Sequence, residues 1–144
     1  QWEDIDTAQW SSIWNLITQN YDVCFVDLGR DIPHAIQTDI LHKSDAIITT
    51  SCLDPVSLSA LKSFLETHEA YQAKQYLLIN QAPKEAKGLI NKHLTSQGKR
   101  ILGLLPLETK TMWDQVYKGF PIALQKKSPW KKALNQSLET LQTL

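Results

Sequence analysis

Hydrophobic and polar residues follow two different spacings along the chain, and these spacings predict its helices and strands. Apolar residues three or four positions apart are typical of one helix face, whereas short continuous apolar runs are typical of strands buried on both faces. The first pattern predicts helices over residues 7–19, 33–43, 55–71, 84–97, 109–118 and 130–143. The second predicts strands over residues 21–27, 46–50, 75–80 and 100–105.

Residue types at several boundaries favour these helices. Thr7 is suited to cap the first helix, and Pro33 suits the first turn of the second. Asp54 is expected to be the N-cap of the third helix, with Pro55 at its first position. Gly98 is the expected stop of the fourth.

The predicted elements alternate between helix and strand. Strands that alternate with helices need crossover connections, and these produce a parallel sheet with helices on both faces. The 144 residues contain no internal repeat, low-complexity segment or long linker. We therefore expect a single α/β segment over residues 1–144, with a mostly parallel sheet covered by helices on both faces.

Composition narrows the classes of function. Lys plus Arg (15) balance Asp plus Glu (15), so we expect no basic surface for specific nucleic-acid binding. No apolar run approaches the roughly 18 residues of a membrane span. The chain begins at Gln1 without the features of a signal peptide, which favours a cytoplasmic protein, and without an initiator Met, which favours a fragment or a processed chain.

Cysteine and histidine do not suggest a metal site. Cys24 and Cys52 lie in apolar stretches and belong to no CxxC or Cys/His cluster, so we expect two small buried side chains in a reducing compartment. The four histidines are scattered without the spacing of zinc ligands.

Polar residues follow the predicted strands, and ligands of parallel sheets bind beyond the carboxyl ends of strands. Asp27 closes the first predicted strand after four apolar residues, as in a Walker B motif, whose carboxylate holds Mg²⁺. The alternative is a carboxylate that caps the next turn. Asn80 ends the third predicted strand, and Pro106 and Leu107 follow the fourth.

The order and spacing of these motifs carry a family resemblance. The segments concerned are residues 21–28, 44–50, 77–80 and 101–106. Together they resemble the C-terminal part of the MinD/ParA deviant-Walker ATPases, which have a P-loop NTPase fold. The segment 54–58 and residues 118–121 resemble the CpaE/TadZ pilus-assembly branch. That branch continues its Walker B strand as Asp-Leu-Pro-Arg, whereas this chain has Asp27-Leu28-Gly29-Arg30.

The resemblance implies a site and a function. Asp27 would hold Mg²⁺ through water, Asn80 would hydrogen-bond adenine, and Pro106 and Leu107 would flank the base. Residues 28–33 would form the switch that senses the γ-phosphate of ATP. The implied protein forms a nucleotide-dependent homodimer and positions or assembles a surface pilus or secretion machine, so pilus-assembly or secretion proteins are the implied partners.

The phosphate loop of that family is absent from these 144 residues. No glycine precedes Lys-Ser or Lys-Thr, so neither GxxxxGK[ST] nor its deviant form occurs. This chain alone is not expected to hydrolyse ATP, and its catalytic residues stay unknown. Either an N-terminal piece supplies the loop and a central strand, or the segment is rearranged into a four-stranded sheet.

Two other functional hypotheses stay open. The first is a degenerate, non-catalytic ATPase-like scaffold or interaction domain, which Gly29 in place of the branch's Pro favours. The second is an unrelated α/β regulatory domain of receiver or flavodoxin shape, although no acidic cluster follows the first predicted strand.

The last predicted helix has an apolar stripe on one side. We expect this stripe to pack on the chain's own sheet, the alternative being a peripheral membrane contact. The nearby lysines are expected to form a solvated face, the alternative being a contact with anionic lipid or DNA. The stripe consists of Trp130, Leu134, Leu138 and Leu141, and the lysines are Lys126, Lys127, Lys131 and Lys132.

Overall fold

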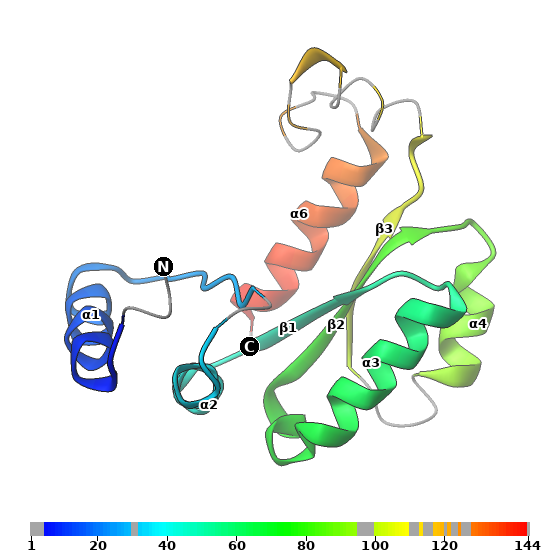
Figure 1. The fold of residues 1–144 in the computed structure, drawn as a ribbon. Helices are drawn as coiled ribbons and strands as arrows, with labels where there is room; N and C mark the ends of the chain where they lie inside the picture. Colours follow the sequence, from blue (N-terminus) through cyan, green and yellow to red (C-terminus); the bar gives the residue numbers. More distant parts are fainter. Residues whose placement is uncertain are drawn as a thin grey trace. The chain divides into compact units, whose positions relative to one another are not determined.

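A computed structural model describes residues 5–29, 32–94, 100–109, 113, 117–119, 121, 124 and 128–143. The chain divides into two compact units, Gln1–Asp45 and Ala46–Leu144. The first unit has two helices, and the second has a sheet with helices around it (Figure 1). The predicted helix over 109–118, Gly98, Lys126 and Lys127 lie wholly or largely outside the described residues.

The N-terminal unit contains α1 (Thr7–Asn20) and α2 (His34–Lys43). Both helices were expected, but Asp6 and not Thr7 caps α1. The Asp6 carboxylate accepts a hydrogen bond from the Gln9 backbone N–H (2.8 Å), and the Gln9 side chain accepts one from the Asp6 N–H (3.0 Å). This reciprocal capping box satisfies the backbone N–H groups of both Asp6 and Gln9. Pro33 is the N-cap of α2 and not a residue of its first turn.

The core of this unit lies between the two helices. The Trp10 side chain is 4% exposed and packs with Ile32, Ile36 and Ile40. The Trp10 indole Nε1 also donates a hydrogen bond to the Asp39 carboxylate (2.9 Å). A helix pair of this kind is stabilised mainly by the apolar surface that it removes from water.

The strand predicted over residues 21–27 is absent. Residues 21–29 form neither helix nor strand, and the side chains of Tyr21, Val23 and Phe25 are 68–72% exposed. Only Val26 and Leu28 of this segment pack against the core of the unit. The apolar run predicted burial, but burial also requires a neighbouring strand for the backbone, and residues 21–29 have none. For the same reason the expectation of a buried Cys24 is wrong, because this thiol is exposed, while Cys52 is half-buried.

The C-terminal unit contains a three-stranded parallel sheet in the order β1-β2-β3. Its strands are β1 (Ile47–Ser51), β2 (Gln75–Ala82) and β3 (Ile101–Pro106). They confirm the last three predicted strands, so the described sheet has three strands where the sequence predicts four. β2 runs two residues beyond its predicted end at Asn80.

Helix α3 (Pro55–Thr67) follows β1 and starts as predicted. The Asp54 carboxylate accepts hydrogen bonds from the backbone N–H groups of Val56 (3.1 Å) and Ser57 (2.9 Å). Hydrogen bonds from Ser57 hold the pKa of the Asp54 carboxyl below its usual value. The helix ends before the predicted Tyr71, and the 3₁₀ helix η2 (Glu69–Lys74) leads into β2.

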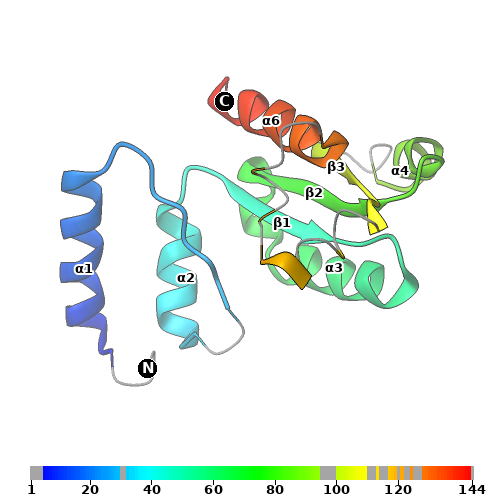
Figure 2. The same ribbon diagram turned by 90° about the horizontal axis from the view of Figure 1, so that it is seen from above.

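Helices cover both faces of the sheet, as predicted. On one face, α3 and α4 (Ala86–His93) bury Leu61, Leu65 and Ile90 against Leu77 and Ile79 of β2. On the other face, α6 (Pro129–Gln142) lies along β3 (Figure 2). The expected packing of the last helix on its own sheet is thus confirmed for the helix, but not for the whole predicted stripe. Leu138 is exposed, and the buried residue of α6 is Ser137, which the stripe did not include.

Candidate functional site

The carboxyl ends of β2 and β3 lie next to each other and hold three of the four predicted site residues. Pro106, half-buried, pairs with Ala82, and the Leu107 backbone N–H donates a hydrogen bond to the Ala82 carbonyl (3.1 Å). The Leu107 side chain is 53% exposed. Asn80, two residues before the end of β2, therefore shares this edge with Pro106 and Leu107.

An irregularity near the end of β2 involves the Asn80 side chain. The Asn80 Oδ1 accepts a hydrogen bond from the backbone N–H of Gln81 (2.9 Å). Gln81 has a positive φ of 51°, a backbone conformation that few residues other than glycine adopt. The register between β2 and β3 shifts at this point, between Ile79 and Ala82. Asn80 is half-buried, and its Nδ2 donates no hydrogen bond to the described residues.

Asp27 belongs to the N-terminal unit, whereas Asn80, Pro106 and Leu107 belong to the C-terminal unit. It is exposed and lies in the segment that forms no strand. The Walker B prediction requires a carboxylate at the end of a sheet strand, so the local geometry of that motif is absent at Asp27. Residues 28–33, the predicted switch, are described only in part.

A contact that the sequence did not reveal joins the loop after β3 to α6. The buried Ser128 hydroxyl donates a hydrogen bond to the Glu108 carboxylate (2.9 Å). The same oxygen accepts hydrogen bonds from the backbone N–H groups of Trp130 (3.1 Å) and Lys131 (3.3 Å). Ser128 is therefore the N-cap of α6, with Pro129 at the first position. This pattern of residue types could have predicted the cap, but not its carboxylate partner.

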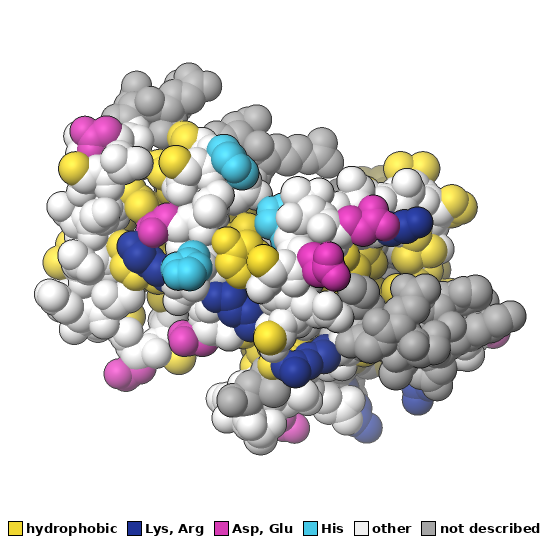
Figure 3. Space-filling view, turned by 90° about the horizontal axis from the view of Figure 1, so that it is seen from below, with side chains coloured by type: hydrophobic (Ala, Val, Ile, Leu, Met, Phe, Trp, Pro, Cys, Tyr) yellow, Lys and Arg dark blue, Asp and Glu magenta, His cyan; other side chains and the backbone are white. Residues whose placement is uncertain are grey.

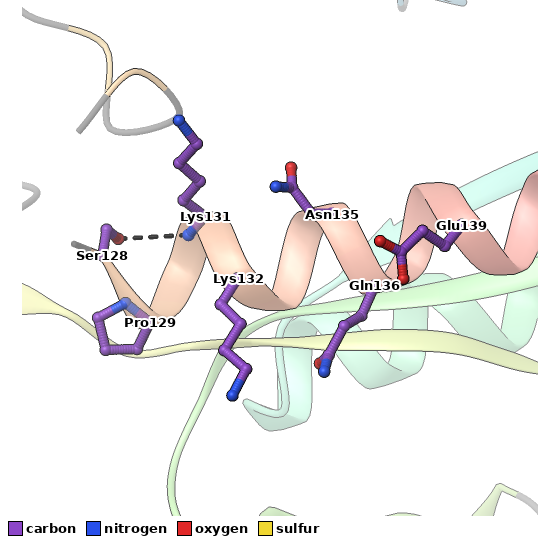
Figure 4. Close-up of a pocket in the computed structure, with 7 residues that line it drawn as sticks. All are labelled: Ser128, Pro129, Lys131, Lys132, Asn135, Gln136 and Glu139. Carbon is purple, nitrogen blue, oxygen red and sulfur yellow. Dashed lines mark hydrogen bonds between the residues drawn. The ribbon is translucent and has the colours of Figure 1, made fainter. Parts of the chain in front are cut away.

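An open pocket of about 650 Å³ runs along one side of α6. Figure 4 shows its polar side chains projecting from successive turns of the helix. They include two lysines, two amides and one carboxylate, so the pocket carries both signs of charge. None of the four predicted site residues lines it. The lining residues are Ser128, Pro129, Lys131, Lys132, Asn135, Gln136 and Glu139.

Lys, Arg, Asp and Glu side chains are interspersed on the described part of the face in Figure 3. Within the described residues, no three His, Cys, Asp or Glu side chains are grouped to hold a metal ion. In the same part of the chain, no helix combines the length and hydrophobicity that a membrane crossing requires.

Two charged side chains of the N-terminal unit, Asp39 and Lys43, form an ion pair on α2. Lys43 Nζ lies 2.8 Å from the Asp39 Oδ2, the oxygen that also accepts from Trp10. This hydrogen bond from Lys43 is the main reason that the pKa of the Asp39 carboxyl lies below its usual value. Asp39 thus joins α1 to α2.

No family model and no curated protein sequence matches the chain. The structure places Asn80, Pro106 and the exposed Leu107 together at one edge of the parallel sheet, near the ends of β2 and β3.

Proposed function

We propose that the chain carries the base-binding side of a nucleotide-dependent protein of MinD/ParA type, with the CpaE/TadZ branch as the nearest resemblance. Such a protein would position or assemble a surface pilus or secretion machine, and it would dimerise with bound nucleotide. The phosphate-binding loop of that activity is not contained in these 144 residues.

The observation that carries this proposal is the state of the Asn80 amide. Its Oδ1 accepts one hydrogen bond from Gln81 and keeps a second lone pair, while Nδ2 has no described partner. The second lone pair of the Asn80 Oδ1 can accept a hydrogen bond from the amino group of adenine. The Asn80 Nδ2 can donate one to the neighbouring ring nitrogen. Pro106 and the exposed Leu107 stand at the adjacent strand end, where apolar groups can cover the faces of a base.

Asn80, Pro106 and Leu107 do not provide the groups that bind the phosphates of a nucleotide or its Mg²⁺ ion. Phosphate binding requires a nest of backbone N–H groups and a lysine, and the sequence contains no such loop. The Mg²⁺ role of Asp27 stays a prediction of the resemblance. We therefore derive no hydrolytic step for this chain.

Calorimetric titration of the chain with adenosine and with Mg-ATP tests the proposal. If the chain contacts only the adenine base, adenosine and Mg-ATP should bind with equal and weak affinity, because they share that base. Asn80→Ala should weaken both by about 3- to 10-fold, which corresponds to the loss of one net hydrogen bond. Asn80→Asp should weaken them similarly, because Asp keeps the acceptor for the Gln81 N–H but lacks the amide donor.

Asn15→Ala is the matched control, since Asn15 is an exposed amide on α1. Adenosine that does not bind, or that binds equally to the Asn80 variants, would contradict the proposal. Much tighter binding of Mg-ATP than of adenosine would show a phosphate site in this chain and would also contradict it.

A second candidate is the degenerate, non-catalytic scaffold. Two observations favour it: the absent phosphate loop, and Asp27 on a segment without a strand. For this protein the same titrations should give no heat with either ligand, and the thermal midpoint of unfolding should not change with millimolar Mg-ATP. A rise of that midpoint would exclude the scaffold, because only a ligand of the folded state stabilises it.

A further inference from the structure

The spacing of buried side chains along β2 shows that one extra residue is inserted near its end. Leu77 and Ile79 belong to the core that α3 and α4 cover, as expected for side chains two positions apart on a strand. Ala82 belongs to the same core, although it lies three positions after Ile79 and a regular strand would turn it to the opposite face. β2 therefore contains a β-bulge between Ile79 and Ala82, where its register against β3 also shifts.

The bulge consists of Asn80 and Gln81, and neither residue is paired with β1 or β3. The Gln81 backbone N–H lies outside the ladder and donates instead to the Asn80 Oδ1 (2.9 Å). The φ of Gln81 is 51°, a left-handed conformation that is unfavourable for a residue with a Cβ. The Gln81 side chain is exposed, so the unfavourable conformation accompanies a positioned backbone donor and not a buried side chain.

This donor determines the orientation of the Asn80 amide. With Oδ1 toward Gln81, the amide accepts a hydrogen bond from the backbone N–H. A flipped amide would place the Nδ2 hydrogens against that N–H, donor against donor. The amide therefore keeps one orientation, in which a second lone pair of Oδ1 and both hydrogens of Nδ2 are available to a ligand.

Purines with an amino group and purines with an oxo group at position 6 require opposite orientations of such an amide. Adenine presents an amino donor beside the N1 acceptor, so it pairs with an amide oxygen and an amide NH₂ in that order. Hypoxanthine presents an oxo acceptor beside the N1–H donor, which is the reverse pattern. When the ring and the ribose keep the same placement, an amide of fixed orientation matches only one of the two classes.

We propose that Gln81 is a positioning residue of the base site and determines its choice of base. The backbone N–H of Gln81 holds the Asn80 amide in the orientation that suits a 6-amino purine, so adenosine binds better than inosine. This inference rests on the proposed base-binding function and adds to it the group that selects the base. The side chain of Gln81 has no part in the selection.

Calorimetric titration of the chain with adenosine and with inosine tests the proposal. The native chain should prefer adenosine by about 10-fold or more, because inosine would leave polar groups of the amide and the base facing like groups. Gln81→Val should reduce the preference to below about 3-fold, because a β-branched residue disfavours a positive φ and withdraws the N–H from Asn80. Gln81→Gly is the matched control, since glycine adopts a positive φ readily and keeps the N–H, so the preference should be unchanged.

The outcomes separate this inference from the proposed function. Adenosine that binds through Asn80 without a preference over inosine, or with a preference that Gln81→Val leaves intact, overturns this inference and leaves the base site standing. Loss of the preference in Gln81→Gly also overturns it, because that variant keeps the donor. A native chain that binds no adenosine contradicts the proposed function and this inference together.

An NMR measurement on the chain without ligand decides the matter even if Gln81→Val does not fold. The Gln81 amide proton should show the small temperature coefficient of a hydrogen-bonded proton. Asn80→Ala should raise this coefficient to that of a solvent-exposed amide, whereas Asn80→Asp should keep it small because aspartate retains the acceptor. A Gln81 amide that behaves as solvent-exposed in the native chain, or that Asn80→Ala does not change, overturns the proposal.

Discussion

Gly103 and Ser137 determine how closely α6 approaches the sheet. A Cβ on Gly103 would overlap the Ser137 Oγ and would lie 3.2 Å from the Ser137 Cβ. Ser137 is almost fully buried, and its hydroxyl donates to the Ala133 carbonyl of the preceding helical turn (3.0 Å). Because Gly103 of β3 has no side chain, Ser137 of α6 can lie directly against the strand at this position.

Gly103→Ala should lower the free energy of unfolding by about 1–3 kcal/mol, the usual cost of overpacking. Adding Ser137→Ala should recover part of this loss, because it removes the Oγ but leaves the tight Cβ contact. Urea denaturation of the two single variants and the double variant measures the coupling.

Gly88→Ala is a control with the opposite expected sign. A Cβ at Gly88 of α4 meets nothing within 4 Å, so alanine should stabilise the helix by about 0.5–1 kcal/mol. For the Gly103/Ser137 pair, additive changes in the free energy of unfolding in the double variant would show that the two positions do not compete for space.

At the Asn80 edge, the sequence located the residues but not their geometry. The sequence placed Asn80 at the end of its strand, whereas β2 continues to Ala82. The positive φ of Gln81 could not be predicted, since glutamine carries no preference for that conformation. Gln81 lies where the register between β2 and β3 shifts, and this register is a property of the assembled sheet.

At the scale of elements, α1 and α2 share one carboxylate. Asp39 of α2 accepts hydrogen bonds from Trp10 of α1 and from Lys43 one turn further along α2. Its pKa is lowered from the usual value of 3.8. The ionised carboxylate thus stabilises the folded state above that value, and this contribution is lost as the pH falls through the lower, folded-state pKa.

Asp39→Asn should therefore reduce the loss of stability in acid. Between about pH 5 and pH 3, the urea midpoint of the native chain should fall further than that of the variant. Asparagine keeps an acceptor for the Trp10 indole N–H, so the variant removes the titrating carboxylate but not this hydrogen bond. Parallel midpoint curves for the two chains would show that Asp39 contributes nothing to the pH dependence.

Elements whose ends carry local start or stop residues could be predicted from the sequence, whereas elements that depend on a distant neighbour could not. Asp54-Pro55 specifies the start of α3 by a side-chain cap and a fixed φ, both of which are local effects. The segment 21–27 has an equally apolar sequence, but whether it forms a strand depends on a neighbouring strand. Local sequence cannot supply that neighbour, and three of its apolar side chains are exposed.

On the largest scale, the described residues form two hydrophobic clusters. One consists of residues before Asp45, centred on Trp10 and Ile36. The other consists of residues after Ala46, centred on Leu77 and Ile79. The helix–strand alternation predicted one α/β segment, and periodicity along the chain does not show which apolar faces share a core.

Residues 46–144 should therefore fold without the N-terminal unit. We expect this fragment to unfold cooperatively in urea and to keep the dispersed amide NMR spectrum of its residues in the full chain. A fragment without a cooperative transition would show that its sheet requires residues 1–45.

The exposed thiol of Cys24 makes the segment after α1 accessible to chemistry. Because Cys52 is half-buried, a thiol-reactive dye attaches first at Cys24, without any engineered cysteine. The dye would lie between Val23 and Phe25, so its fluorescence anisotropy would change whenever an apolar surface covers these side chains. A dye attached at Cys24 of the native chain can thus be used to screen for molecules that bind this segment.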